Sequence, residues 1–143
     1  MKAGVKAAIM SLTKCETLPI RTAEDIVLAR QAMRARMVEL AFTLVAQTKM
    51  VTATSELGRN TLLWGGGGTA RLESLVDGGR TGVRATFEDQ GPGIANIEQA
   101  LTNGFTTGQG LGLGLGGSKR LVHDFEIFSR PGQGTRVSIT MWK

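Results

Sequence analysis

The sequence predicts an α+β fold, a two-layer α/β sandwich in which helices cover one face of a mostly antiparallel mixed sheet. Apolar residues recur at helical spacing in the first half of the chain, whereas they alternate with polar residues in the second half. Glycine-rich turns join several of the alternating segments. No repeat or linker divides the 143 residues, so we expect one domain over residues 14–143 and a flexible tail over residues 1–13.

The first half begins with a possible edge strand at residues 14–20, since Pro19 near its end has no N–H to donate. Thr22 followed by Asp25 is a capping signal, and it predicts that a helix starts there. The apolar residues of that helix are Ile26, Ala29, Met33, Met37 and Leu40. A second helix is predicted from Thr43 to Trp64, because the four glycines at 65–68 cannot continue a helix.

The second half reads as strands and short helices. Residues 70–77 and 83–88 alternate between apolar and polar, and Asp77-Gly78-Gly79 between them is a hairpin signal. A short helix is expected at residues 97–102, and the glycine-rich segment 104–117 is expected to be mobile. A helix at 118–124, a strand at 125–129, a turn at 131–134 and a last strand through Met141 complete the chain.

The composition is that of an ordinary globular protein, at 41% hydrophobic and 20% charged residues. The single cysteine, Cys15, excludes an internal disulfide and a four-cysteine zinc site, which favours a cytoplasmic protein. No stretch approaches the ~20 apolar residues that span a membrane. The net charge is +5, but the basic residues form no run, so the charge fits a polyphosphate or an acidic partner better than a nucleic acid.

The first candidate for chemistry is the pair Glu56 and Asn60 on the second helix. Their i, i+4 spacing places both side chains on one face. A carboxylate beside a carboxamide can hold a metal-bound phosphate and act as a base. Such polar pairs are also common on solvated helix surfaces, so the pair alone does not decide between the two interpretations.

The second candidate is the segment from Glu88 to Ile94. Asp89 has the same parity as the apolar residues of its strand, which predicts an inward-pointing carboxylate. A buried charge needs a partner, and the amino group of adenine would supply one. Gly91 and Gly93 leave room for a ring to approach, although an Asp at a strand-to-turn junction is the plainer alternative.

The third candidate is the glycine run at residues 108–117. Alternating glycines expose backbone N–H groups, and the helix expected from Ser118 adds its N-terminal dipole, so the segment suits phosphates. Its interleaved leucines argue against a flexible linker. Gly112-x-Gly114-x-x-Gly117 matches a dinucleotide fingerprint, but no strand precedes it, and the chain has no P-loop. Thr135 shares the inward parity of the last strand, so its hydroxyl could reach a base through water.

Taken in this order, the segments resemble the GHKL superfamily of ATPases and kinases, whose ATP-binding domain has the Bergerat fold. Glu56 and Asn60 look like its N box, Asp89-x-Gly91-x-Gly93 looks like its first glycine box, and 110–116 looks like its second glycine box and ATP lid. Gly132-x-Gly134-Thr135 looks like its last box. Within the superfamily the chain is most similar to the RsbT-type switch kinases, through residues 22–34, 55–60, 88–94, 104–105 and 119–121.

The resemblance implies ATP and Mg²⁺ as cofactors and a role for each motif. Asn60 would ligate Mg²⁺, Asp89 would bind the adenine amino group, and Glu56 would orient or deprotonate the acceptor hydroxyl. The other residues implied at the nucleotide are Gly91, Gly93, Ile94, Gly110, Leu111, Gly112, Leu113, Gly114, Leu115 and Thr135. The acceptor would be a serine or threonine of a STAS-domain partner, and the released kinase would activate a serine phosphatase in a stress or sigma-factor pathway.

Three alternatives remain open at this point. An anti-sigma factor kinase would share the ATP site but hold a sigma factor, and a nucleotide-binding partner-switch module would lack catalysis. A nucleic-acid binder rests on the net charge alone. Gly58 and the four glycines at 65–68 depart from the RsbT-type pattern. Gly58 weakens the second helix relative to alanine, and the glycine run is expected to be unusually loose.

Overall fold

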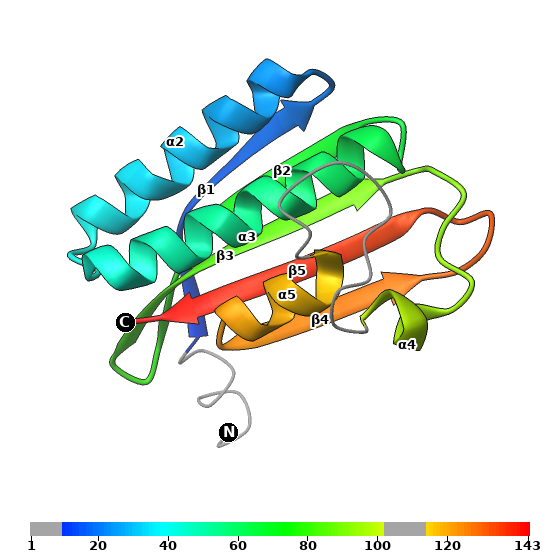
Figure 1. The fold of residues 1–143 in the computed structure, drawn as a ribbon. Coiled ribbons are helices and arrows are strands. Elements are labelled where there is room, and N and C mark those ends of the chain that lie inside the picture. The colour runs from blue at the N-terminus through cyan, green and yellow to red at the C-terminus, as the bar shows by residue number, and fades with distance from the viewer. Residues whose placement is uncertain (1–9, 102–113) are drawn as a thin grey trace.

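The computed structural model describes residues 10–101 and 114–143, which form one sheet and the helices packed on it (Figure 1). The chain begins with a strand and two long helices and continues with a β-hairpin, two short helices and a second strand pair. The elements in order are β1 (Met10–Ile20), α2 (Ala23–Glu39), α3 (Leu44–Leu63), β2 (Gly68–Asp77), β3 (Arg80–Asp89), α4 (Ile97–Ala100), α5 (Gly114–Leu121), β4 (Asp124–Ser129) and β5 (Thr135–Trp142).

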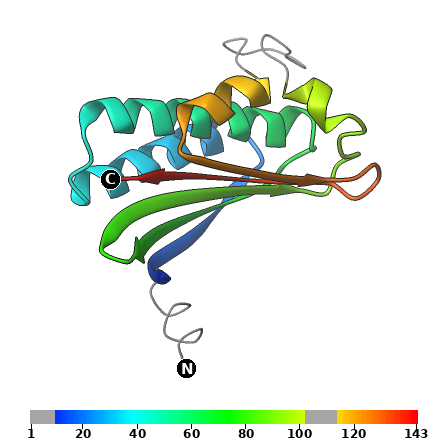
Figure 2. The ribbon, with the colours of Figure 1, turned by 90° about the horizontal axis from the view of Figure 1, so that it is seen from below.

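The five strands form one sheet in the order β1-β2-β3-β5-β4. Helices α2, α3 and α5 all lie on the same face of this sheet (Figure 2). This arrangement confirms the α+β sandwich expected from the sequence. The strand pairings among the described residues are all antiparallel, so the mixed sheet that we expected is antiparallel across residues 10–101 and 114–143.

Both long helices start where the sequence predicts, the first at the capping signal of Thr22 and the second at Thr43. Thr22 accepts a hydrogen bond from the Asp25 backbone N–H, and Asp25 accepts one from the Thr22 N–H in return, which completes a capping box. The Thr43 side chain caps α3 through the Ala46 N–H, and Trp64 is the C-cap residue of α3. The two helices run side by side above β1, β2 and β3 (Figure 1).

Strand β1 is longer than the sequence predicts. It begins at Met10, which pairs with Asp77, and it ends at Ile20, which pairs with Gly68. The strand therefore begins four residues before the domain start that we expected at residue 14, because backbone pairing with β2 extends across an irregularity between Leu12 and Lys14. Residues 1–9 lie outside the described residues.

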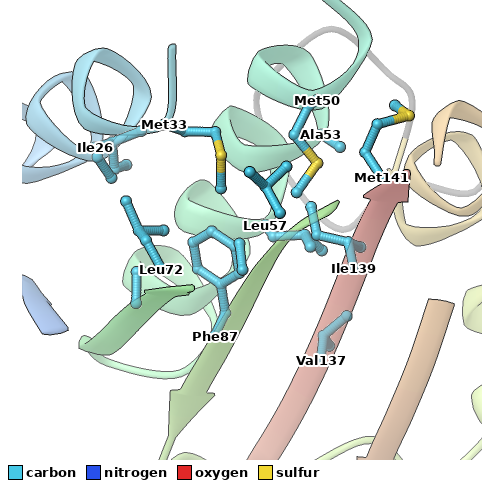
Figure 3. Close-up of a cluster of buried hydrophobic side chains, with 14 of the residues drawn as sticks. Ile26, Met33, Met50, Ala53, Leu57, Leu72, Phe87, Val137, Ile139 and Met141 are labelled. Carbon is cyan, nitrogen blue, oxygen red and sulfur yellow. The ribbon is translucent and has the colours of Figure 1, made fainter. Parts of the chain in front are cut away.

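The core fills the layer between the helices and the sheet (Figure 3). Met33 of α2 and Met50 and Leu57 of α3 are almost fully buried, and they meet sheet residues such as Leu72 and Ile139. Val83, Ala85 and Phe87 of β3 are buried as their parity predicts. This alternation carries the chain to Asp89, which is the last residue of β3 and faces the helices.

The antiparallel register gives the sheet two distinct ends. At one end β3 finishes with Asp89, which pairs with Thr135 at the start of β5. At the other end lie the β2–β3 hairpin, Met10 of β1 and Trp142 of β5, which pairs with Gly82.

Candidate functional site

A cavity of about 340 Å³ opens at the end of the sheet where β3 finishes. Its walls come from the last turns of α3, the end of β3, the start of β5, α4 and the first turn of α5. The described residues that line it are Leu57, Asn60, Thr61, Trp64, Gly65, Phe87, Asp89, Pro92, Gly93, Ile94, Ala95, Asn96, Gln99, Ala100, Gly114, Leu115, Thr135 and Val137. Most of these side chains are apolar, and Asp89 is the only ionisable one among the described residues of the cavity wall.

Asp89 is 9% exposed and lines this cavity. Burial raises the pKa of the Asp89 carboxyl above its ordinary value, chiefly because desolvation disfavours the charged form. The nearby Glu88 charge adds to the rise, whereas the backbone N–H groups of Gly91 and Thr135 oppose it. The Gly91 N–H donates to Asp89 Oδ1 at 2.8 Å. A charged acceptor in an apolar wall suits a ligand that brings hydrogen-bond donors.

The glycines at 65–68, which the sequence presents as a loose run, lie against this carboxylate. A Cβ atom on Gly65 would overlap the Asp89 side chain, and a Cβ atom on Gly91 would lie 2.7 Å from the Gly65 Cα. Gly68 begins β2 and cannot carry a side chain either, because a Cβ atom there would overlap the Glu88 carbonyl oxygen. The predicted looseness is therefore wrong for Gly65 and Gly68.

The loop after β3 is held in place by the turn between β4 and β5. Gly93 has a φ of 79°, and a side chain there would overlap the Arg130 carbonyl group. The Gly132 N–H donates to the Pro92 carbonyl at 2.7 Å. The Ile94 N–H donates to the Ser129 hydroxyl at 2.8 Å. These contacts fix Gly93 and Ile94 at the cavity wall, where the sequence motif expects them.

Helix α3 contributes Asn60 to the cavity, but Glu56 lies outside the described cavity wall. Glu56 is one turn earlier on the same helix and is only 3% exposed, so it is not the solvated surface residue of the plainer interpretation. None of the hydrogen bonds or ion pairs given by the described residues engages the side chains of Glu56 or Asn60.

Helix α5 starts at Gly114, four residues before the predicted start at Ser118. Gly114 and Leu115, which we expected in the glycine-rich loop around the phosphates, are the first residues of this buried helix. The burial of Leu115 in the core favours this early start, since it outweighs the poor helix propensity of the glycines. Gly110, Leu111, Gly112 and Leu113 lie outside the described residues.

Sequence reasoning missed Ser129 and Trp64. Ser129 is the last residue of β4, and its hydroxyl contacts Ile94, Gly134 and Thr135. Its inward parity with Phe125 and Ile127 was a signal that could have found it. Trp64 is half-exposed and lines the cavity at the end of α3. The described part of the chain holds no cluster of three or more His, Cys, Asp or Glu side chains that could bind a metal ion, and none of its helices is long and apolar enough to span a membrane.

Comparison with known proteins identifies relatives of the chain. Residues 46–143, well over half of the chain, match the family model described as histidine kinase-, DNA gyrase B-, and HSP90-like ATPase. The chain is 44% identical over 123 residues to "Serine/threonine-protein kinase RsbT" of Bacillus subtilis (strain 168), a match that covers 86% of this chain and 92% of the relative.

A solved structure of the RsbU and RsbW domains of Rv1364c from Mycobacterium tuberculosis has a similar fold, with a TM-score of 0.62 and 20% sequence identity. That match covers 92% of this chain and 33% of the longer solved chain, and at this identity it supports the fold alone. The family match and the 44% identical relative decide the question of family. The chain belongs to the family of histidine kinase-, DNA gyrase B- and HSP90-like ATPases, the GHKL superfamily.

Proposed function

We propose that this chain is an ATP-dependent serine/threonine protein kinase that phosphorylates a STAS-domain partner. In this proposal it acts in the cytoplasm as a partner switch in a bacterial stress or sigma-factor pathway, and on release it activates a serine phosphatase. The observation that carries the proposal is the 44% identity to a serine/threonine-protein kinase over 86% of the chain. The cavity supports it, because an apolar pocket with one desolvated carboxylate suits a nucleobase that carries an amino group.

The adenine ring would enter between the apolar side chains of the cavity. Asp89 would accept a hydrogen bond from the adenine amino group, with Gly93, Ile94 and Thr135 at the edge of the ring. Gly91 would act indirectly, since it packs against Gly65 behind the carboxylate. The phosphates would extend toward Asn60 and the first turn of α5, where the backbone of residues 110–115 would contact them.

Asn60 fits the role of a Mg²⁺ ligand. It lines the cavity, and its side-chain amide oxygen is a ligand of the kind that a hard cation prefers. Mg²⁺ in phosphoryl-transfer sites takes few protein ligands and keeps waters and phosphate oxygens as the rest. A bound Mg²⁺ would neutralise part of the phosphate charge.

Glu56 is proposed to act on the acceptor hydroxyl. The only acidic residue among the described cavity walls is Asp89, which would be engaged by the adenine ring. A residue that takes the proton of the acceptor hydroxyl must therefore come from outside that wall. Glu56 lies one helical turn from Asn60. In the transfer, the bond from the γ-phosphorus to the bridging oxygen of ADP breaks as a bond to the serine Oγ forms, and the hydroxyl proton passes to the Glu56 carboxylate.

Transfer of labelled γ-phosphate from ATP to a purified STAS-domain protein of the same organism tests this proposal. We expect labelling of the wild-type partner and none of a partner whose acceptor serine is replaced by alanine. Glu56→Gln should lower the transfer rate by about 100-fold or more while nucleotide affinity stays within a few-fold. Glu24→Gln, at an exposed position in the first turn of α2, is the matched control and should transfer at the wild-type rate.

Each rival function has its own outcome in this assay. ATP binding without transfer to any STAS partner would favour a non-catalytic switch module. A stable complex with a sigma factor would favour an anti-sigma factor kinase. Equal transfer by wild type and Glu56→Gln would end the proposed role of Glu56 as a base.

A further inference from the structure

Ser129 is a buried hydroxyl at the edge of the cavity, and it has a full set of hydrogen-bond partners. Its Oγ lies 2.8 Å from the Ile94 backbone nitrogen, 2.9 Å from the Gly134 carbonyl oxygen and 2.8 Å from Thr135 Oγ1. Ser129 itself is 8% exposed and is not among the described residues that line the cavity. It contacts two segments that contribute to the cavity wall, the loop after β3 through Ile94 and the start of β5 through Thr135.

Counting protons fixes the direction of each of these bonds. A serine hydroxyl has one proton to donate and two lone pairs that accept. The Gly134 carbonyl oxygen can only accept, so it takes the Ser129 proton, and the Ile94 N–H can only donate. The remaining bond must then be donated by the Thr135 hydroxyl. Because Gly134 is buried, turning the Ser129 proton toward Thr135 instead would leave a carbonyl that water does not easily satisfy.

The consequence falls on Thr135, which lines the cavity. Its only hydroxyl proton is held by Ser129, so Thr135 Oγ1 presents lone pairs alone to a ligand. Asp89 pairs with Thr135 across the two strands and, in its charged form, is also only an acceptor. A water held between them would donate one proton to each and would likewise accept from the ligand.

We propose that Ser129 is a positioning residue that holds the Thr135 hydroxyl as a hydrogen-bond acceptor, so that this wall selects 6-amino over 6-oxo purine nucleotides. The inference rests on the proposed ATP site and deepens it. At the 6-position an exocyclic amino group brings donors to two acceptors, whereas the carbonyl of hypoxanthine or guanine brings a third acceptor to the same place. Without the Ser129 hydroxyl, the Thr135 hydroxyl would rotate and donate to that carbonyl. The preference for 6-amino over 6-oxo purine nucleotides would then fall.

A purely structural role for Ser129 makes a different prediction. Its bonds to Ile94 and Gly134 also hold the two loops together, so its loss would weaken every nucleotide to the same extent. The ratio of the affinities for ATP and ITP separates the two roles, because ITP differs from ATP only in the 6-substituent and in the proton on the adjacent N1, with the same ribose and phosphates. Absolute affinity does not separate them.

The test is calorimetric titration of ATP and ITP, each with Mg²⁺, into wild type, Ser129→Ala, Thr135→Val and the double variant. We expect Ser129→Ala to lower the ATP-to-ITP preference by about tenfold. Thr135→Val, which leaves Ser129 in place, should also lower the preference. In the Thr135→Val background, Ser129→Ala should not change the preference further.

Ser138→Ala is the matched control. Ser138 lies on β5, and its hydroxyl is 2.9 Å from Thr86 Oγ1 on the opposite parity from Thr135. It should keep the wild-type preference. If Ser129→Ala weakens ATP and ITP equally, or if Thr135→Val keeps the full preference, the inference is overturned while the ATP site stands. A wild-type protein that binds neither nucleotide overturns the proposed function itself.

Discussion

Two glycine-rich segments, 65–68 and 114–117, have similar compositions, but the structure uses them in different ways. The first connects α3 to β2 and brings its backbone against Asp89 and Glu88. The second forms the start of α5 and is buried. The comparison teaches that a count of glycines does not measure looseness. What matters is which atoms occupy the space where a side chain would be.

The glycines of the first segment, residues 65–68, also differ from one another in how closely they are packed. Side chains on Gly65 and Gly68 would overlap neighbouring atoms, whereas a Cβ atom on Gly66 would have nothing within 4 Å. Gly66 has a φ of 75°, so its requirement is for backbone conformation and not for space. In the second segment the anchor is Leu115, which is 8% exposed and belongs to the core.

The largest effect on stability is expected from Gly68→Ala. Its new methyl group would meet the Glu88 carbonyl oxygen, a backbone atom inside a strand pair that cannot easily move. We expect the free energy of unfolding to fall by about 3 kcal/mol. Denaturant unfolding measures this change, and a wild-type midpoint would show that the start of β2 is free to shift.

Leu115→Ala tests the anchor of the second segment. Removal of a buried leucine side chain should lower the free energy of unfolding by about 2 kcal/mol or more. Since Leu115 also lines the cavity, ATP affinity should fall as well. Leu63→Ala, at a half-exposed position near the end of α3, is the matched control and should cost much less in the same unfolding assay. Equal losses for the two variants would contradict burial as the anchor.

Gly65→Ala should act on binding as well as on folding. The new methyl group would overlap both the carboxylate of Asp89 and its Cβ atom, which side-chain rotation cannot move, so the end of β3 and the carboxylate would both be displaced. We expect ATP affinity to fall by about tenfold, measured by calorimetry. An unchanged ATP affinity would mean that the Asp89 carboxylate does not bind the ligand from its present position.

The pH dependence of stability reports directly on the burial of Asp89. Because the folded pKa is raised above the ordinary value of 3.8, the folded state binds this proton more tightly than the unfolded state. The contribution of Asp89 to the free energy of unfolding therefore falls as the pH rises from about 3.8 through the folded pKa. Above the folded pKa this contribution no longer changes with pH. The difference in unfolding free energy between Asp89→Asn and wild type should grow in favour of the variant over this window. A difference that is flat with pH would contradict the shift.

The smallest effect is expected from Gly66→Asn. Asparagine tolerates positive φ, and the space around Gly66 is open, so the free energy of unfolding should change by less than about 0.5 kcal/mol. Thermal unfolding at matched concentration is the measurement. A loss as large as that of Gly68→Ala would remove the distinction between the two positions.

The sequence predicted the features that depend on nearby residues. Thr22 and Thr43 mark helix starts because a cap is satisfied within three residues, and the parity of Asp89 follows from its own strand. The start of β1 was missed because its pairing depends on β2, far along the chain. The contact of Gly65 with Asp89 and that of Ser129 with Ile94 join residues distant in sequence, so no local pattern reports them.

The register of the sheet places Met10 and Trp142 at the hairpin end, away from the cavity between Asp89 and Thr135. Polypeptide joined before β1 or after β5 would thus leave the body of the fold on the side opposite the ligand. The architecture is therefore suited to fusion with further polypeptide at either of these strand ends. A fluorescent or affinity fusion at either of these strand ends should likewise leave the cavity accessible.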